Sequence, residues 1–209
     1  MPERPSAWRA GPARLARLLA GLVLFGTGEA AIVAAGLGNS PWTVLAEGVS
    51  EQTTLAVGTA TIAISFVVLA LWIPLRQRLG LGTLANAVVI GAAIDMALLA
   101  LPEDPAGAAR VALLIGGIAL VAIGSGLYLT TALGPGPRDG LMTGLHARTG
   151  ASLRLVRGSI EVTALLVGVA LGGTVGLGTL AFALAIGPAV QLAVERWQTP
   201  EWRAAVARA

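Results

Sequence analysis

The stretch Leu81-Gly-Thr-Leu-Ala-Asn-Ala-Val-Val-Ile-Gly91 returns 96 residues later as Leu177-Gly-Thr-Leu-Ala-Phe-Ala-Leu-Ala-Ile-Gly187, with 8 of 11 residues identical. A second block, of glycines, recurs upstream at an offset of 98, which implies a two-residue slip between the blocks: Gly26, Gly28, Gly36 and Gly38 return as Gly124, Gly126, Gly134 and Gly136. Gly, Ala and Leu are abundant, so a single matching block would be weak support for a repeat. Two blocks that recur in the same order, at nearly the same spacing, are stronger support. The chain is therefore predicted to contain two homologous halves.

Composition restricts the class of protein that these halves build. Hydrophobic residues make up 56% of the 209 residues, charged residues 12%, and the mean hydropathy is +0.80. A soluble domain has about 25% charged residues, so this chain cannot cover a surface that faces water. The absence of Cys excludes a disulfide scaffold. We predict an all-α, polytopic membrane protein.

Six segments are long and apolar enough to cross a bilayer core, which needs about 20 helical residues. A retained first span is favoured over a cleaved signal peptide, because the first apolar run is long and contains Glu29. Breakers or charged residues separate the segments. The predicted spans are Leu15–Gly36, Leu55–Leu75, Leu84–Leu101, Val111–Leu133, Leu155–Gly172 and Leu180–Ala193.

The arginines orient these spans, because cytoplasmic loops retain positive charge. All 14 cationic residues are Arg, and a cytoplasmic N-terminus places 13 of them inside, leaving only Arg110 outside. The predicted outer loops instead carry acids: Glu47, Glu51, Glu103 and Asp104. We therefore predict a plasma-membrane protein with both termini cytoplasmic, divided into a tail (1–14), two three-span repeats (15–104 and 105–195) and a second tail (196–209).

Three spans in each half make the repeats inverted, since the second half then enters the membrane from the opposite side. The arginines agree, because they put the connection at 37–53 outside and its counterpart at 135–152 inside. Inverted three-plus-three repeats are common in secondary transporters, which bind substrate between the halves, although channels use them too.

Three acids fall inside predicted spans, where ionisable groups are costly and suggest function. Glu161 has Arg157 one helical turn away, in a coupling site or, alternatively, a structural ion pair near the interface. Asp95 and Gln191 occupy matching positions of the repeat. Asp95 is predicted to be a proton or cation site or, alternatively, to form a hydrogen bond between helices. Glu29 is flanked by small residues, which allow close helix approach or access of water.

Two connections break a span with Gly and Pro and then start a short helix. Gly38 and Pro41 mark the first break, and Gly136 and Pro137 mark the second. Pro suits the first helical turn, and the helix start presents free N–H groups that bind anions. Arg138, with Asp139 beside it, would add a full positive charge in the second connection. The alternative is a surface loop with an interfacial helix.

Other chemistry has little support in the sequence. The arginines are scattered between apolar runs, which argues against nucleic acid as a partner. His146 is the only His, and no catalytic constellation, metal site or cofactor motif accompanies it. We therefore expect no enzyme.

The second half resembles a known family. Its motifs are Gly134-Pro-Gly-Pro-Arg-Asp-Gly-Leu-Met-Thr-Gly-Leu-His-Ala-Arg-Thr-Gly150, Val156-Arg157 with Glu161, Gly172–Thr179 and Ile186-Gly-Pro188. They are similar to those of the bacterial YczE-type integral membrane proteins, relatives of the YitT group. The resemblance implies a multi-pass plasma-membrane protein without a settled substrate. YitT relatives usually end in a soluble domain, and here we expect only a short tail.

These observations predict a small transporter or permease-like protein that binds a small anionic or polar solute between its halves in the lipid bilayer. The alternative is a non-transporting accessory or regulatory protein that stabilises or localises a partner. The sequence leaves the solute, the coupling ion and homo-oligomerisation open.

Overall fold

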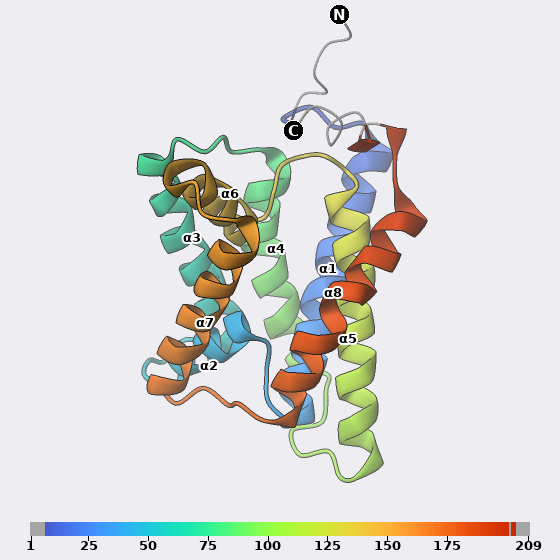
Figure 1. Ribbon diagram of the computed structural model, residues 1–209. Helices are drawn as coiled ribbons and strands as arrows, with labels where there is room; N and C mark the ends of the chain where they lie inside the picture. Colours follow the sequence, from blue (N-terminus) through green and yellow to red (C-terminus); the bar gives the residue numbers. More distant parts are fainter. Residues whose placement is uncertain (1–6, 201, 204–209) are drawn as a thin grey trace, which may run out of the picture.

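The computed structural model describes residues 7–200, 202 and 203, and its secondary structure over these residues is entirely helical (Figure 1). Arg4 and Arg208, which the sequence places in cytoplasmic tails, lie outside the described residues. The prediction of an all-α protein is confirmed. The helices are α1 (Pro12–Ala35), α2 (Pro41–Glu51), α3 (Val57–Leu75), α4 (Leu81–Leu98), α5 (Ala108–Leu129), α6 (Pro137–Thr149), α7 (Leu153–Ala170) and α8 (Leu177–Trp197).

Five of the described helices are long and apolar enough to cross a membrane: α1, α3, α4, α5 and α8. The predicted span Leu155–Gly172 corresponds to α7, which is helical over 18 residues but carries Arg154, Arg157 and Glu161. These charges keep α7 below the apolarity of the other five. A sixth crossing therefore stays a prediction.

The helices repeat with a single spacing. Their starts lie 96 residues apart in every case: Pro12 and Ala108, Pro41 and Pro137, Val57 and Leu153, Leu81 and Leu177. The offset of 98 expected for the upstream glycines is therefore wrong. Gly38, with φ of +103°, matches Gly134, with φ of +121°, and the excess of glycine in the chain created the false register.

Two backbone hydrogen bonds join the halves reciprocally. The Gly82 N–H at the start of α4 donates to the Leu133 carbonyl at 2.8 Å, and the Gly178 N–H at the start of α8 donates to the Leu37 carbonyl at 2.7 Å. Each helix start therefore holds the connection that follows the first helix of the other half. This contact explains the repeated Leu-Gly-Thr-Leu, because a side chain at either Gly would meet backbone atoms.

The helices pack as two groups. In one, α1 lies against α5 and α4, and α5 also packs on α8; in the other, α2 packs on α7 and α3 packs on α6. Figure 1 shows the second group beside the first. The groups meet where α3 lies along α4, whereas α7 makes little contact with α8.

Glycines set the close crossing of α1 and α5. A Cβ added at Gly124 would lie 2.5 Å from the Gly21 carbonyl oxygen, and one added at Gly117 would lie 2.7 Å from the Gly28 carbonyl oxygen. Small residues allow such approach between membrane helices, where van der Waals packing drives association. Apolar side chains, among them Leu18, Leu22 and Val121, fill the core around this crossing.

Asp95 links α4 to the start of α3. Its Oδ1 accepts a hydrogen bond from the Gly58 N–H at 2.6 Å, and its Oδ2 accepts one from the Thr59 hydroxyl at 2.8 Å. The first N–H groups of a helix lack partners within the helix, and a carboxylate complements both them and the helix dipole. Asp95 therefore caps α3 from a neighbouring helix.

The α1–α5 crossing predicts a strong difference between two glycines of α5. Gly124→Ala places a methyl group against backbone that cannot turn away, and we expect a loss of about 1–3 kcal/mol in stability. Gly116 has no atom near its Cβ position, so Gly116→Ala should be neutral or stabilising by up to about 1 kcal/mol, the difference in helix propensity. Thermal unfolding in detergent measures both. Equal stability of the two variants would contradict the crossing.

The capping role of Asp95 predicts that its removal weakens the protein. Asp95→Ala should cost about 0.5–2 kcal/mol, as the loss of a cap does, and Asp95→Asn, which retains an acceptor, should cost less. Asp104→Ala is the control, because Asp104 is exposed and bonded to Arg110 at the surface and such pairs contribute about 0–1 kcal/mol. If neither Asp95 variant changes the unfolding temperature, Asp95 does not act as a cap.

Candidate functional site

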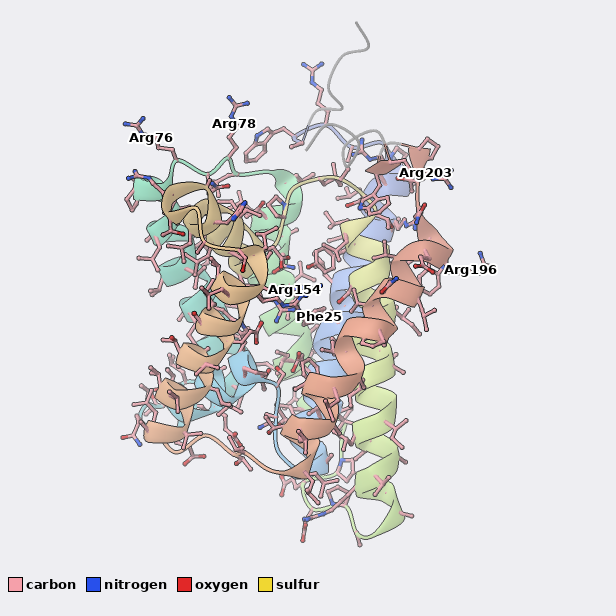
Figure 2. The ribbon with its side chains drawn as sticks, in the orientation of Figure 1. Phe25, Arg76, Arg78, Arg154, Arg196 and Arg203 are labelled. Carbon is pink, nitrogen blue, oxygen red and sulfur yellow. The ribbon has the colours of Figure 1, made fainter. Side chains whose placement is uncertain are left out.

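A cavity of about 70 Å³ lies between the two helix groups, where the starts of α2 and α6 meet α1, α3, α4 and α5. Figure 2 labels one wall residue, Phe25, in the interior about midway along the bundle. The wall is mostly apolar and contains three charged side chains: it comprises Phe25, Glu29, Trp42, Thr43, Thr61, Ile64, Ser65, Val68, Asn86, Ile90, Ile94, Tyr128, Gly136, Pro137, Arg138 and Asp139. Both short helices therefore begin at one cavity.

Glu29, on α1, accepts hydrogen bonds from side chains at the start of α2. Its Oε2 accepts hydrogen bonds from the Ser40 hydroxyl at 2.9 Å and the Thr43 hydroxyl at 2.7 Å. Its side chain is buried, with 3% of the residue exposed. Pro41 occupies the first turn of α2, where its missing N–H has no consequence. The structure thus places the predicted Glu29 in the cavity wall, with one carboxylate oxygen already bonded.

Arg138 enters the cavity from the first turn of α6, which starts at Pro137 after Gly136. Its guanidinium carbon lies 5.7 Å from the centre of the Phe25 ring, a cation–π contact. Among the described residues it has no hydrogen-bond or ion-pair partner. The neighbouring Asp139 differs, because its Oδ2 accepts a hydrogen bond from the Tyr128 hydroxyl at 3.3 Å. Arg138 therefore presents an unused set of donors.

Two further donors in the wall lack partners within the described chain. The indole N–H of Trp42 is buried without a hydrogen bond. Asn86 is 9% exposed, and its amide nitrogen lies 3.2 Å from where a Cβ of Gly136 would stand. Sequence reasoning missed both as binding residues. A signal existed for Asn86, because the matching position of the second repeat block is Phe182.

A smaller cavity of about 30 Å³ adjoins the first and extends it toward α7. Arg138 and Asp139 line both cavities, and the second adds Met142, Arg157, Ile160 and Glu161. The structure thus brings Arg157 and Glu161 to the site. It does not pair them with each other: the ion pair in the described part of the chain is Arg110 with Asp104, at 2.7 Å. The expected Arg157–Glu161 ion pair is therefore absent, although both side chains line this cavity.

The structure does not bring Asp95 and Gln191 to this site. Asp95 bonds to the start of α3. The Gln191 amide donates to Glu195 Oε1 at 3.0 Å on the exposed side of α8. Gly38 packs against Gly176 and shapes the connection rather than the wall. Matching positions in the repeat are therefore not neighbours in space here.

Comparison with known proteins places the chain among bacterial membrane proteins. Residues 12–195 match a family of unknown function, DUF6198. A Haemophilus influenzae protein described as uncharacterized is 44% identical over 186 residues, which cover 89% of this chain and 85% of that protein. The uncharacterized membrane protein YczE of Bacillus subtilis is 31% identical over 170 residues, or 80% of this chain and 79% of that protein.

No solved structure matches the chain. The relation to the YitT group stays a prediction. The match across nearly the whole helical region, the identity to YczE and the apolar helices agree with the resemblance found in the sequence motifs. The chain is therefore a membrane protein of the YczE type and belongs to the DUF6198 family.

Proposed function

We propose that this protein is a small transporter of the permease type, not an enzyme, which binds a small solute in the cavity between two inverted halves. One observation supports this most: the starts of both short helices, α2 and α6, line a single interior cavity with Glu29, Arg138 and Asp139. Secondary transporters bind substrate and coupling ions at the interface between repeats, near interrupted helices.

The packing supports inverted halves. The contact of α2 with α7 mirrors that of α6 with α3, and the contact of α1 with α4 mirrors that of α5 with α8. A two-fold axis that exchanges the halves produces such reciprocal pairs, as it does for the hydrogen bonds of Gly82 and Gly178. If α7 is the sixth crossing, two of its charged side chains, Arg157 and Glu161, face a protein-lined cavity. Ionisable groups in membrane segments are found in such places.

The arginines support cytoplasmic termini in this arrangement. Figure 2 shows Arg76, Arg78 and Arg203 at the end of the bundle where α1 starts, whereas Arg110 lies at the start of α5, bonded to Asp104. Figure 1 shows the start of α5 at the opposite end. The positive-inside rule then assigns the arginine-rich end to the cytoplasm.

Alternating access can be tested without knowing the solute, because the chain contains no Cys. Ser65→Cys puts a small thiol in the cavity wall, and we expect an impermeant thiol reagent to label it in both right-side-out and everted vesicles. Ala63→Cys is the matched control: Ala63 lies two residues away on the exposed side of α3 and should face lipid and stay unlabelled. A cavity opening to one side only, or to neither, would favour the accessory-protein alternative.

Two exposed positions at the ends of the bundle report the orientation of the protein in the same vesicles. Glu103→Cys in the α4–α5 connection should label only in right-side-out vesicles, and Arg78→Cys before α4 only in everted ones, because the first lies outside and the second in the cytoplasm. Reversed labelling of this pair would contradict the proposed orientation.

A further inference from the structure

The donors that the protein leaves unused point to the chemistry of the solute. Arg138 and the Asn86 amide line one cavity without hydrogen-bond partners among the described residues. Donors inside a protein are normally hydrogen-bonded, and a bound ligand that supplies acceptors would satisfy both. We propose that the cavity binds a short-chain organic monocarboxylate, held by Arg138 and Asn86; that this anion is also carried across the membrane rests on the proposed function.

The carboxylate is favoured by the shape of the donor set. A guanidinium presents parallel N–H groups that match the two oxygens of a carboxylate. The first turn of α6 adds backbone N–H groups and the positive end of the helix dipole beside Arg138. Asn86, next to Gly136 at the same helix start, supplies an independent donor from α4. The carboxylate group therefore binds at the start of α6.

The acids around the cavity favour an anion with a single charge. Glu29 and Asp139 line the cavity beside Arg138, and Glu161 lines the smaller cavity that adjoins it; hydroxyl groups bond one oxygen each of Glu29 and Asp139. A divalent anion would add a second negative charge beside these carboxylates, at short range and away from bulk water. These acids repel a second negative charge, so dicarboxylates and phosphate should bind more weakly than a monocarboxylate.

The rest of the wall fits a short hydrocarbon chain. The wall also contains Ile64, Val68, Ile90 and Ile94, from α3 and α4. One water occupies about 10–15 Å³ by the same measure of space, so a cavity of about 70 Å³ holds a ligand of a few non-hydrogen atoms. Propionate and butyrate combine this size with one carboxylate and an apolar end.

Binding is measured on the purified full-length protein in detergent, by tryptophan fluorescence and by the shift of the unfolding temperature on titration. We expect propionate and butyrate to bind, and chloride, phosphate, succinate and propylammonium to bind at least tenfold more weakly. Arg138→Gln should weaken propionate binding about 10- to 100-fold, the loss of a charged hydrogen-bond donor. Arg148→Gln is the matched control, because Arg148 lies on α6 outside the cavity and donates to the Pro74 carbonyl at 2.5 Å, and it should bind normally.

Two further variants keep the test independent of folding. Arg138→Lys retains the charge but not the paired N–H groups, and Asn86→Leu removes the amide donor; each should weaken propionate binding and leave the unfolding temperature without ligand nearly unchanged. Equal binding of propionate by wild type, Arg138→Lys and Asn86→Leu overturns the site. If chloride or succinate binds as tightly as propionate, the proposed class of ligand is wrong.

The labelling of Ser65→Cys separates this inference from the proposed function. Propionate binding that needs Arg138, together with labelling from one side only, upholds the carboxylate site and overturns transport. Labelling from both sides without carboxylate binding upholds alternating access and overturns the carboxylate site.

Discussion

The structure depends on how each half supplies hydrogen-bond partners for the backbone groups where a helix of the other half is interrupted. Buried backbone N–H and C=O groups need hydrogen-bond partners, and the connections after α1 and α5 leave helical geometry. The carbonyls of Leu37 and Leu133 accept the N–H groups of Gly178 and Gly82 from the opposite half. This reciprocal contact fixes α2 and α6 beside the α1–α5 core and so creates the cavity between the two helix groups.

The two halves of the repeat carry different chemistry. Counting 96 residues on, Trp42 corresponds to Arg138, Glu29 to Ser125 and Asn86 to Phe182. The repeat therefore supplies the interrupted helices twice, whereas the polar groups at matching positions differ in chemistry, as Thr43 and Asp139 do. Residues that keep the fold recur, such as Thr83 and Thr179, whose hydroxyls accept the N–H groups of Gly80 and Gly176. Residues that define the site are those in which the halves differ.

The sequence predicted most of the architecture, because apolar runs and the Leu-Gly-Thr-Leu repeat are local patterns. It misjudged the register of the upstream glycines, since glycine is frequent enough to match at a wrong offset. Glu29 and Arg138 were found as candidates, because intramembrane charges and interrupted helices are visible in a sequence. For Asp95 the sequence left a coupling site and a hydrogen bond between helices open, and the structure shows the hydrogen bond, to the start of α3. Such contacts between distant segments, like the unused donors of Trp42 and Asn86, appear only once the chain is folded.

The proposal with the widest consequences is that the cavity between the halves holds a carboxylate at the start of α6. The most direct measurement is anomalous diffraction from crystals of the full-length protein grown with 3-bromopropionate, whose bromine marks the apolar end of the ligand. We expect a bromine peak inside the cavity, beside Ile64 and Ile90, with density for the carboxylate at Arg138. A peak only at the protein surface, or a cavity without bromine at saturating ligand, would contradict it.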